Sequence, residues 1–321
     1  MKMVVSDWRD ALHGAKVCIT GGAGFIGSNL AAVLAEESEV MVIDDLATGK
    51  AENLKGLDIE FCGGSILDFS LLTNKFAGLD YVFHQAALSS VVRSVHNPAK
   101  SNEANITGTL NVLLAAREAK VKKVVFASSS SVYGDTPTLP KREDMACFPL
   151  SPYAVSKFAA ESYCRVFWHN YGFPTVSLRY FNVFGPHQDP KAEYAAVIPI
   201  FVSRINAGKD LVIYGDGEQT RDFTYVEDVV QANILAAVSD EANGKAINVA
   251  TGKRASINEL AKMAMDLVGK KVKVSHVEAR TGDVKHTLAD LTLAKDALGY
   301  KPAWNLKKGL PNTVDYLLHL K

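Results

Sequence analysis

Short apolar runs alternate with longer amphipathic segments over the first two-thirds of the chain. The runs are rich in β-branched residues, and they predict buried strands at 15–20, 39–44, 58–63, 81–86, 123–128 and 175–180. Helical spacing between them predicts helices at 28–37, 105–119 and 152–171. Because strands alternate with helices, and because such apolar strands are buried on both faces, we expect an α/β fold with a doubly wound parallel sheet.

The pattern becomes looser after about residue 181, where Pro186, Pro190 and Pro199 interrupt it. Further helices are predicted at 197–207 and 257–269, and further strands at 211–214 and 246–251. We therefore expect two interleaved domains: a larger one over 1–180 and about 223–251, and a smaller α+β one over about 181–222 and 252–321. Residues 1–14 predict a short amphipathic helix that packs on the first strand.

Composition and charge exclude several classes of function. The 321 residues carry 35 basic and 35 acidic side chains without a Lys/Arg block, so neither nucleic acid nor a membrane surface is an expected partner. No apolar run is long enough to span a bilayer, and residues 1–14 lack the apolar core of an export signal. Cys18, Cys62, Cys147 and Cys164 are not spaced as metal ligands, and scattered thiols fit a reducing cytoplasm.

A glycine-rich turn, GGAGFIG, follows the first predicted strand and opens the first predicted helix. Either Gly21 or Gly22, together with Gly24 and Gly27, gives the spacing of a dinucleotide-binding turn. Such a turn needs a positive φ and a close backbone approach to a pyrophosphate, which the free N–H groups of a helix N-terminus then bind. The alternative is a purely structural turn, which the strand–turn–helix context disfavours. The larger domain is therefore expected to be a Rossmann domain.

Asp44 ends the second predicted strand, where a carboxylate can accept hydrogen bonds from a ribose hydroxyl pair. Asp44 and Asp45 together would repel a 2′-phosphate. The sequence therefore favours NAD over NADP as the cofactor.

Tyr153 and Lys157 are four residues apart at the start of the long helix predicted at 152–171, so they share a helical face. A nearby ammonium favours the phenolate form and lowers a tyrosine pKa, which makes a base that works nearer neutral pH. Alone, such a pair is most often an ordinary surface pair. Here a serine cluster at 128–131 ends the preceding strand, and strand ends gather ligand groups in a parallel sheet.

A set of motifs follows in a fixed order along nearly the whole chain: GGAGFIG (21–27), DDLATG (44–49), HQAA (84–87), NITGT (105–109), SSSSVYG (128–134), YAVSK (153–157), RYFNVFGP (179–186), GDGEQTRDF (215–223) and RTGDV (280–284). In this combination the sequence resembles the extended short-chain dehydrogenase/reductases, and within them the nucleotide-sugar 4-epimerases. The resemblance implies NAD as the cofactor, a UDP-sugar as the substrate and a substrate-binding role for the smaller domain.

The resemblance also implies roles for individual residues. On the cofactor side these are Gly21, Gly24, Phe25, Ile26, Gly27, Asp44, Ser65, Ile66, Ala86, Ala87 and Asn105, with Tyr153 and Lys157 at the nicotinamide ribose. On the nucleotide-sugar side they are Arg93, Ser94, Asn182, Ala196, Val197, Tyr214, Arg221, Arg280 and Asp283. Tyr153 would be the catalytic base, Lys157 its electrostatic partner, and Ser129 the hydrogen-bond partner of the sugar 4-hydroxyl, a role that Ser130 would share.

Two departures from the family pattern lie around the adenosine. The family often has Asp-Asn-Leu where this chain has Asp44-Asp45-Leu46, and Asp-Ile where it has Ser65-Ile66. They change the expected contacts with the adenosine but not the identity of the cofactor.

Residue 131 separates two reaction types within this family. Related enzymes that dehydrate nucleotide sugars use an acidic residue at the position of Ser131. Without an acid or base there, elimination of water lacks its proton carrier. We therefore expect oxidation and re-reduction at C4, that is, a 4-epimerase, rather than a 4,6-dehydratase or a decarboxylase. The alternative is another nucleotide-sugar-modifying enzyme of the family, a 4,6-dehydratase or a UDP-glucuronate epimerase or decarboxylase.

Thr287, four residues after Asp283, occupies a position that faces the sugar in related epimerases. A small residue there is associated with N-acetylated sugars and a bulky aromatic residue with plain hexoses. We therefore expect UDP-GlcNAc and UDP-GalNAc as substrates, with UDP-glucose and UDP-galactose also accepted because a larger pocket rejects a smaller sugar poorly. The alternative is that Thr287 only packs against its neighbours.

Two further alternatives are a non-catalytic NAD sensor on the same fold and an ordinary sugar dehydrogenase that releases NADH. The sensor is disfavoured because this chain keeps Ser129, Tyr153 and Lys157. In the family, helices such as those at 103–119 and 152–171 form a homodimer through a four-helix bundle, and we expect a homodimer here.

Overall fold

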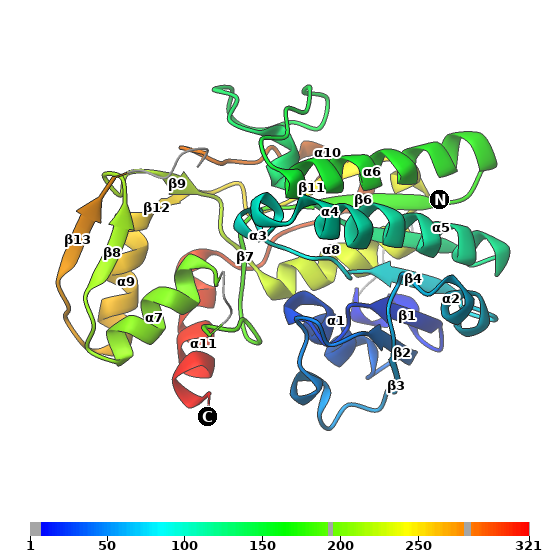
Figure 1. Cartoon of the computed structure of the whole chain (residues 1–321), viewed down its shortest axis with the longest axis horizontal. Coiled ribbons are helices and arrows are strands. Elements are labelled where there is room, and N and C mark those ends of the chain that lie inside the picture. Colours follow the sequence, from blue (N-terminus) through cyan, green and yellow to red (C-terminus); the bar gives the residue numbers. More distant parts are fainter. Residues whose placement is uncertain (1–7, 192–194, 279–283, 321) are drawn as a thin grey trace.

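The computed structural model describes residues 8–191, 195–278 and 284–320. Its centre is a seven-stranded parallel sheet with the order β11-β6-β5-β4-β1-β2-β3 (Figure 1). The strands are β1 (Lys16–Thr20), β2 (Glu39–Asp44), β3 (Glu60–Gly63), β4 (Tyr81–His84), β5 (Lys123–Ser129), β6 (Thr175–Tyr180) and β11 (Ala246–Val249). The parallel sheet and all seven of its strands agree with the prediction, apart from shifts of one or two residues at the ends.

Helices cover both faces of this sheet, which confirms the Rossmann-type α/β class. One face carries α1 (Phe25–Leu34), α8 (Val226–Val238) and α10 (Thr292–Leu298), and the other carries α2 (Phe69–Lys75), α5 (Gly108–Glu118) and α6 (Pro152–Tyr171). Alternate residues of β1 show the two layers: Val17 and Ile19 join the first core, and Cys18 joins the second. The predicted helices do not include α2, α8 or α10.

A separate apolar core lies beside the sheet, among the elements on the left of Figure 1. It is built from α7 (Val197–Asn206), α9 (Ile257–Val268), α11 (Leu306–His319) and β8 (Leu211–Tyr214), which pairs in parallel with β13 (Val274–Val277). The helices α7 and α9 and the strand β8 agree with the sequence pattern. The domain boundaries given above stay a prediction.

Short elements connect the two cores. Strand β7 (Val183–Phe184) pairs with β10 (Thr224–Tyr225), and β9 (Thr220–Arg221) pairs with β12 (Ala255–Ser256). Helices α3 (Val91–His96) and α4 (Pro98–Asn102) precede α5, and 3-10 turns occur at Ala51–Leu54, Ser130–Tyr133 and Asp240–Ala242. Over the residues described, no helix combines the length and apolar character needed to cross a membrane.

Three predicted helices differ from the structure. The helix predicted at 28–37 is α1, which begins and ends three residues earlier, at Phe25–Leu34. The segment 105–119 is not one regular α-helix, because Glu103–Thr107 is π-helical and α5 begins at Gly108. The first described helix is a 3-10 helix at Arg9–Leu12 that packs against α8, where Arg9 forms an ion pair with Glu227 at 2.7 Å. Over the described residues this helix is held against α8, whereas the sequence predicts that it packs on the first strand.

Candidate active site

The glycine-rich turn between β1 and α1 brings three backbone segments close together. Gly21 has φ +72°, and a Cβ on it would lie 2.5 Å from the backbone nitrogen of Ala86. A Cβ on Gly27 would lie 2.2 Å from the carbonyl oxygen of Gly21. Of the two spacings that the sequence offers, the one that begins at Gly21 therefore places its first glycine where the positive φ is needed. The turn leaves the N-terminus of α1 open to an anion.

Asp44 is fixed at the end of β2 by the same turn. Its carboxylate is 8% exposed and accepts hydrogen bonds from the backbone N–H of Ala23 (2.9 Å) and of Leu46 (2.8 Å). Burial raises the pKa of Asp44 above its usual value, and the two N–H donors act in the opposite direction. A carboxylate has about four acceptor positions, so oxygen lone pairs remain for the two hydroxyls of a ribose.

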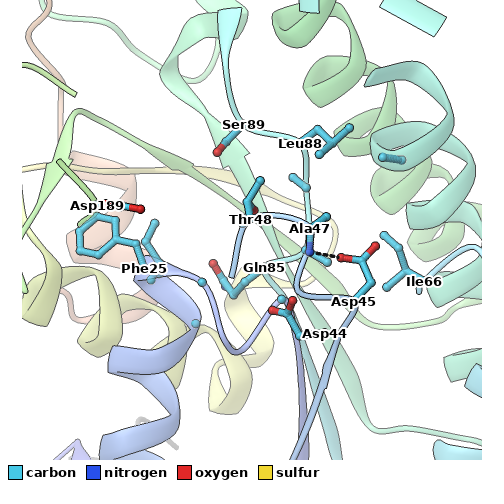
Figure 2. A pocket seen from close by; sticks show the side chains of 18 of the residues that line it. Phe25, Asp44, Asp45, Ala47, Thr48, Ile66, Gln85, Leu88, Ser89 and Asp189 are labelled. Carbon is cyan, nitrogen blue, oxygen red and sulfur yellow. Dashed lines mark hydrogen bonds between the residues drawn. The ribbon is translucent and has the colours of Figure 1, made fainter. Parts of the chain in front are cut away.

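A cleft of about 580 Å³ runs along the carboxyl ends of the strands, where open α/β sheets bind their ligands. In Figure 2, Phe25 and Asp189 lie at one end of this cleft, Asp45 and Ile66 at the other, and Gln85 between them. The cleft is lined by Gly21, Gly24, Phe25, Ile26, Gly27, Asp44, Ser65, Ile66, Ala86, Ala87, Tyr153 and Lys157, as well as Arg93 and Ala196. The structure thus gathers the predicted cofactor residues in one groove, with the exception of Asn105.

Asn105 lies behind the wall of the cleft. It is 1% exposed, its Oδ1 accepts from the N–H of Leu88 at 2.8 Å, and its Nδ2 donates to the Ser156 hydroxyl at 2.9 Å. A direct contact between Asn105 and a cofactor stays a prediction. Its visible contacts join the cleft wall to α6.

Tyr153 and Lys157 lie on the first turns of α6. Ser151 caps this helix by accepting from the N–H of Ala154 at 3.2 Å, and Pro152 occupies its first position. Lys157 is 4% exposed and its Nζ donates to the carbonyl of Ala127 at 2.7 Å. Burial lowers the pKa of Lys157 to about 7. Burial also raises the pKa of Tyr153, while the Ser129 hydroxyl acts to lower it.

The hydroxyl of Ser129 is oriented by Ser131. Ser129 Oγ accepts from the N–H of Ser131 at 3.2 Å and from its Oγ at 2.9 Å. With two bonds accepted, the Ser129 proton is available for donation toward Tyr153 or a ligand oxygen. From the sequence, Ser131 is notable only because related dehydratases have an acid at this position. Its role in orienting Ser129 follows from the 3-10 turn at Ser130–Tyr133, which the sequence pattern does not predict. Ser130 is partly exposed on the same turn, and of these serines only Ser128 lines the cleft, whereas Ser129 and Ser130 do not.

A buried ion pair lies under the serine cluster. Arg179 on β6 binds Glu161 on α6, and Ser128 donates to the same carboxylate at 2.7 Å. The sequence analysis missed both charged residues. One feature of the sequence could have pointed to Glu161: it lies four residues after Lys157, on the helix face that carries Tyr153 and Lys157.

Asn182 and Thr287 meet beside Asp222, and neither lines the cleft. Asn182 Nδ2 donates to Thr287 Oγ1 at 3.1 Å and to the carbonyl of Asp222 at 3.2 Å. Thr287 Oγ1 also accepts from the N–H of Asp222 at 3.1 Å. Thr287 is therefore tied to a residue predicted to face the sugar, in addition to being small.

The remaining nucleotide-sugar positions are spread around this region. Ser94 is buried and donates to the carbonyl of Val91 at 2.6 Å within α3, and Val197 begins α7. Tyr214 is 39% exposed at the end of β8, and Arg221 Nη1 donates to the carbonyls of Thr220 and Lys285, each at 3.1 Å. Arg280 and Asp283 lie outside the described residues.

Asp222 organises the segments around these positions, and the sequence analysis did not single it out. This fully buried carboxylate accepts from Thr251, from the N–H of Gly252 and from the N–H of Ala289 at 2.7–3.2 Å. It thereby ties the chain next to Arg221 to the segment that follows Thr287. Burial raises the pKa of Asp222, and the donors oppose that shift.

Comparison with known proteins identifies the family. The profile of the NAD dependent epimerase/dehydratase family matches residues 17–250. The chain belongs to this family. Among curated relatives, UDP-glucose 4-epimerase of Mycolicibacterium smegmatis is 38% identical over 309 residues, which span 94% of this chain and 98% of the relative. Proteins named as a UDP-N-acetyl-α-D-glucosaminuronate decarboxylase (Bacillus cytotoxicus) and a UDP-glucuronate 4-epimerase (Thermodesulfobacterium geofontis) are each 36% identical over 318 residues.

Solved structures of family members superpose closely on this fold. UDP-N-acetylglucosamine 4-epimerase of Methanobrevibacter ruminantium, in complex with UDP-N-acetylmuramic acid, is 42% identical with a TM-score of 0.92 and covers 95% of this chain and 99% of its own. UDP-glucose 4-epimerase of Thermus thermophilus, in complex with NAD, is 37% identical with a TM-score of 0.86 and covers 95% of this chain and all of its own.

NAD is the cofactor of this family, and the residues of the cleft fit it. The turn at Gly21 and Gly27 has no space for a Cβ, as a backbone cradle for a pyrophosphate requires. The buried Asp44 carboxylate stands at the end of β2, and the adjacent Asp45 adds a second negative charge. Among the described residues, no cluster of His, Cys, Asp and Glu could hold a metal ion.

Proposed function

We propose that this protein is a 4-epimerase of UDP-hexoses, acting on UDP-GlcNAc and UDP-GalNAc and also on UDP-glucose and UDP-galactose. The observation that carries the proposal is the position of Tyr153 and Lys157 on the wall of the dinucleotide cleft, next to a Ser129 whose proton is free to donate. The family membership and the 4-epimerases among the relatives support it.

In this reaction Tyr153 removes the proton from the sugar 4-hydroxyl, and Ser129 hydrogen-bonds the same oxygen. When bound, NAD takes up the C4 hydride and returns it. Burial holds the pKa of Tyr153 high in the free protein, and the positive charges of Lys157 and of an oxidised nicotinamide would favour the phenolate. The 4-keto sugar would turn over while its diphosphate stays bound, and Tyr153 would return the proton to the 4-oxygen of the epimer.

Ser131 supports re-reduction over elimination. Its hydroxyl donates to Ser129, so the position that holds an acid in related dehydratases here serves to orient the serine. Loss of water from the 4-keto sugar needs a group that transfers a proton, and a serine hydroxyl is a poor one. A second candidate activity, on UDP-glucuronate or its N-acetylated form, is suggested by relatives with those names.

The N-acetylated sugars are proposed as substrates because residue 287 is a half-buried threonine rather than a bulky aromatic. The solved UDP-N-acetylglucosamine 4-epimerase at 42% identity supports the same substrate class. Because its hydroxyl also binds Asn182, we propose that Thr287 keeps this amide oriented toward the sugar pocket.

The test is to incubate the purified protein separately with UDP-GlcNAc, UDP-glucose and UDP-glucuronate and to identify products by chromatography. The expected result is a mixture of 4-epimers from the first two and no net formation of NADH by absorbance. Accumulation of NADH with an oxidised product would point to a dehydrogenase instead. A 4-keto-6-deoxy product or released CO₂ would point to a dehydratase or a decarboxylase.

We also propose that the protein is a homodimer that assembles through α6 and the preceding helices. Val155, Tyr163 and Val166 are 37–49% exposed and lie on one face of α6, so they form a group of apolar side chains that a partner could cover. Light scattering after size-exclusion chromatography should give twice the 34.7 kDa chain mass. A Val155→Glu variant that elutes at the same mass would contradict this interface. The domain boundaries and a cytoplasmic location remain predictions.

A further inference from the structure

A chain of hydrogen bonds crosses the core between the glycine-rich turn and the catalytic helix. Thr20, the residue before Gly21, contacts His84 Nδ1 through its hydroxyl at 2.7 Å. His84 Nε2 contacts the hydroxyl of Thr109 at 2.9 Å, and Thr109 Oγ1 lies 2.6 Å from the carbonyl oxygen of Asn105. Thr20, His84 and Thr109 are all at most 1% exposed, so water cannot replace these contacts.

The geometry fixes the direction of each bond. A carbonyl oxygen carries no proton, so the contact between Thr109 and Asn105 requires the Thr109 proton. Thr109 must then accept from His84, which places a proton on Nε2. In a neutral ring that carries its proton on Nε2, Nδ1 accepts from the hydroxyl of Thr20. A neutral His84 thus donates on one side and accepts on the other.

The surroundings of His84 keep the ring neutral. Its ring centroid lies 5.6 Å from that of Phe126, and Lys157 Nζ lies 4.9 Å from the centroid of the same phenyl ring. Burial lowers the pKa of His84 to about 3, and the nearby Lys157 acts in the same direction. A charged ring at this place would also oppose the ammonium form of Lys157.

The chain ends in the π-helical segment Glu103–Thr107, which contains Asn105. A π-helical turn inserts an extra residue and is often found at functional sites. Here it presents the Asn105 amide to two partners at once, the backbone of Leu88 in the cleft wall and the Ser156 hydroxyl. Ser156 in turn donates to the carbonyl of Tyr153 at 2.8 Å and directly precedes Lys157.

We propose that His84 is a positioning residue: through Thr109 it holds the carbonyl of Asn105 in the π-helical turn, so that Asn105 sets the spacing between the cofactor-cleft wall at Leu88 and the Tyr153–Lys157 end of α6. This role rests on the proposed epimerase function. His84 touches neither the cleft nor the reacting atoms, since it is fully buried and acts only through these neighbours.

The test compares Thr109→Val, which keeps the shape but removes the hydroxyl, with Thr109→Ser, which restores it. Thr109→Val is expected to lower kcat at least tenfold, with the KM for the UDP-sugar and the bound NAD content changed less than twofold. The rise of kcat with pH should also move to higher pH, because Tyr153 loses its alignment with Lys157. Thr109→Ser should recover kcat to within threefold of the wild type.

Thr313→Val is the matched control. Thr313 is also fully buried and donates to a backbone carbonyl, that of Gly309 at 3.1 Å, but in α11 and away from the cleft. Thr313→Val should lower the melting temperature about as much as Thr109→Val does, but its kcat should equal that of the wild type. Equal kcat values for Thr109→Val and Thr313→Val would overturn the proposal, as would a Thr109→Ser protein as slow as Thr109→Val.

Two further measurements keep the outcomes separate. If Thr109→Val does not fold, Thr20→Val removes only the donor to Nδ1 and should lower kcat at least threefold; an unchanged kcat would overturn the proposal. Nitrogen-15 NMR of the His84 ring should show a protonated Nε2 and an unprotonated Nδ1 from pH 5.5 to 8.5. A ring that titrates in this range would contradict the hydrogen-bond chain even if the wild type had a different catalytic activity.

Discussion

Arg179 on β6 binds Glu161 on α6 through two hydrogen bonds, Nε to Oε2 at 3.0 Å and Nη2 to Oε1 at 2.6 Å. The side chains are 5% and 8% exposed, so both charges are removed from water. Arg179 pairs across the sheet with Ser128, which donates to the same carboxylate. Because Glu161 follows Lys157 by one helical turn, the pair fixes the catalytic face of α6 against β5 and β6.

Removing one member of this pair should cost far more stability than removing both. Glu161→Gln leaves a buried guanidinium without its counter-charge, which is expected to lower the free energy of unfolding by about 3–5 kcal/mol. The double variant Arg179→Met/Glu161→Leu removes both charges and should lose much less. Urea unfolding of the three proteins at pH 7 measures the difference. Equal losses for the single and the double variant would show that the charges are not coupled.

Replacing Tyr153 with phenylalanine should strongly lower turnover without disturbing the fold. Only the hydroxyl is lost, and general acid–base groups contribute on the order of 10²–10⁴-fold to rate. The expected result is a kcat lower by that factor, with bound NAD and melting temperature close to those of the wild type. Tyr171→Phe is the control, because it removes the same hydroxyl at the exposed far end of the same helix, away from the cleft, and should leave kcat unchanged. Full activity in Tyr153→Phe would remove the proposed base.

The sheet and the Tyr–Lys pair were open to prediction because they depend on local patterns. The apolar run at 81–86 identifies β4 by itself, and the four-residue spacing of Tyr153 and Lys157 sets them on one face of α6. Parallel strands then gather their carboxyl ends at one edge, which brings the glycine-rich turn to the same cleft without any further information.

The groups that support this site could not be predicted in the same way. The segment 105–119 has an unbroken helical pattern, and nothing in it reveals that Asn105 lies in a π-helical turn. Asp222 accepts hydrogen bonds from residues about 30 and 67 positions away, contacts that no local spacing encodes. Residues that touch ligands follow family motifs, whereas residues that hold them depend on the completed tertiary structure.

The buried Lys157 should make stability depend on pH in the cofactor-free protein. Its pKa is about 7 in the folded state and is expected near 10.4 when unfolded. Between these values the unfolded chain binds more protons, so the free energy of unfolding contributed by this group rises with pH from about 7 to 10, by about 1 kcal/mol per unit. The difference in unfolding free energy between the wild type and Lys157→Met, measured from pH 7 to 9, reports this. A difference that does not change with pH would show that Lys157 is not desolvated.

Enlarging residue 287 should change the preference between sugars. Thr287→Tyr fills space and removes the acceptor of Asn182, so kcat/KM should fall much more for UDP-GlcNAc than for UDP-glucose. Thr287→Val keeps the size but not the hydroxyl and should lower kcat/KM for both sugars, because Asn182 and the N–H of Asp222 lose their partner. The ratio of kcat/KM values for the two sugars is the measurement. If the ratio is the same in Thr287→Tyr and the wild type, residue 287 does not select the sugar.

An ion pair joins the two walls of the cofactor cleft and should slow the release of NAD. Lys50 Nζ lies 2.6 Å from Asp189 Oδ2, and both residues line the cleft. Lys50 follows the loop after Asp44. Asp189 lies on the loop whose Pro186 carbonyl accepts a hydrogen bond from Asn29 of α1. The pair is partly exposed and worth at most about 1 kcal/mol, so Lys50→Met or Asp189→Asn should speed NAD dissociation by up to about fivefold. Salt should have the same effect on the wild type and little on the variants. The double variant Lys50→Asp/Asp189→Lys exchanges the two charges and restores their attraction, so the slow release of NAD should return. Release as fast as in the single variants would mean that these side chains act separately.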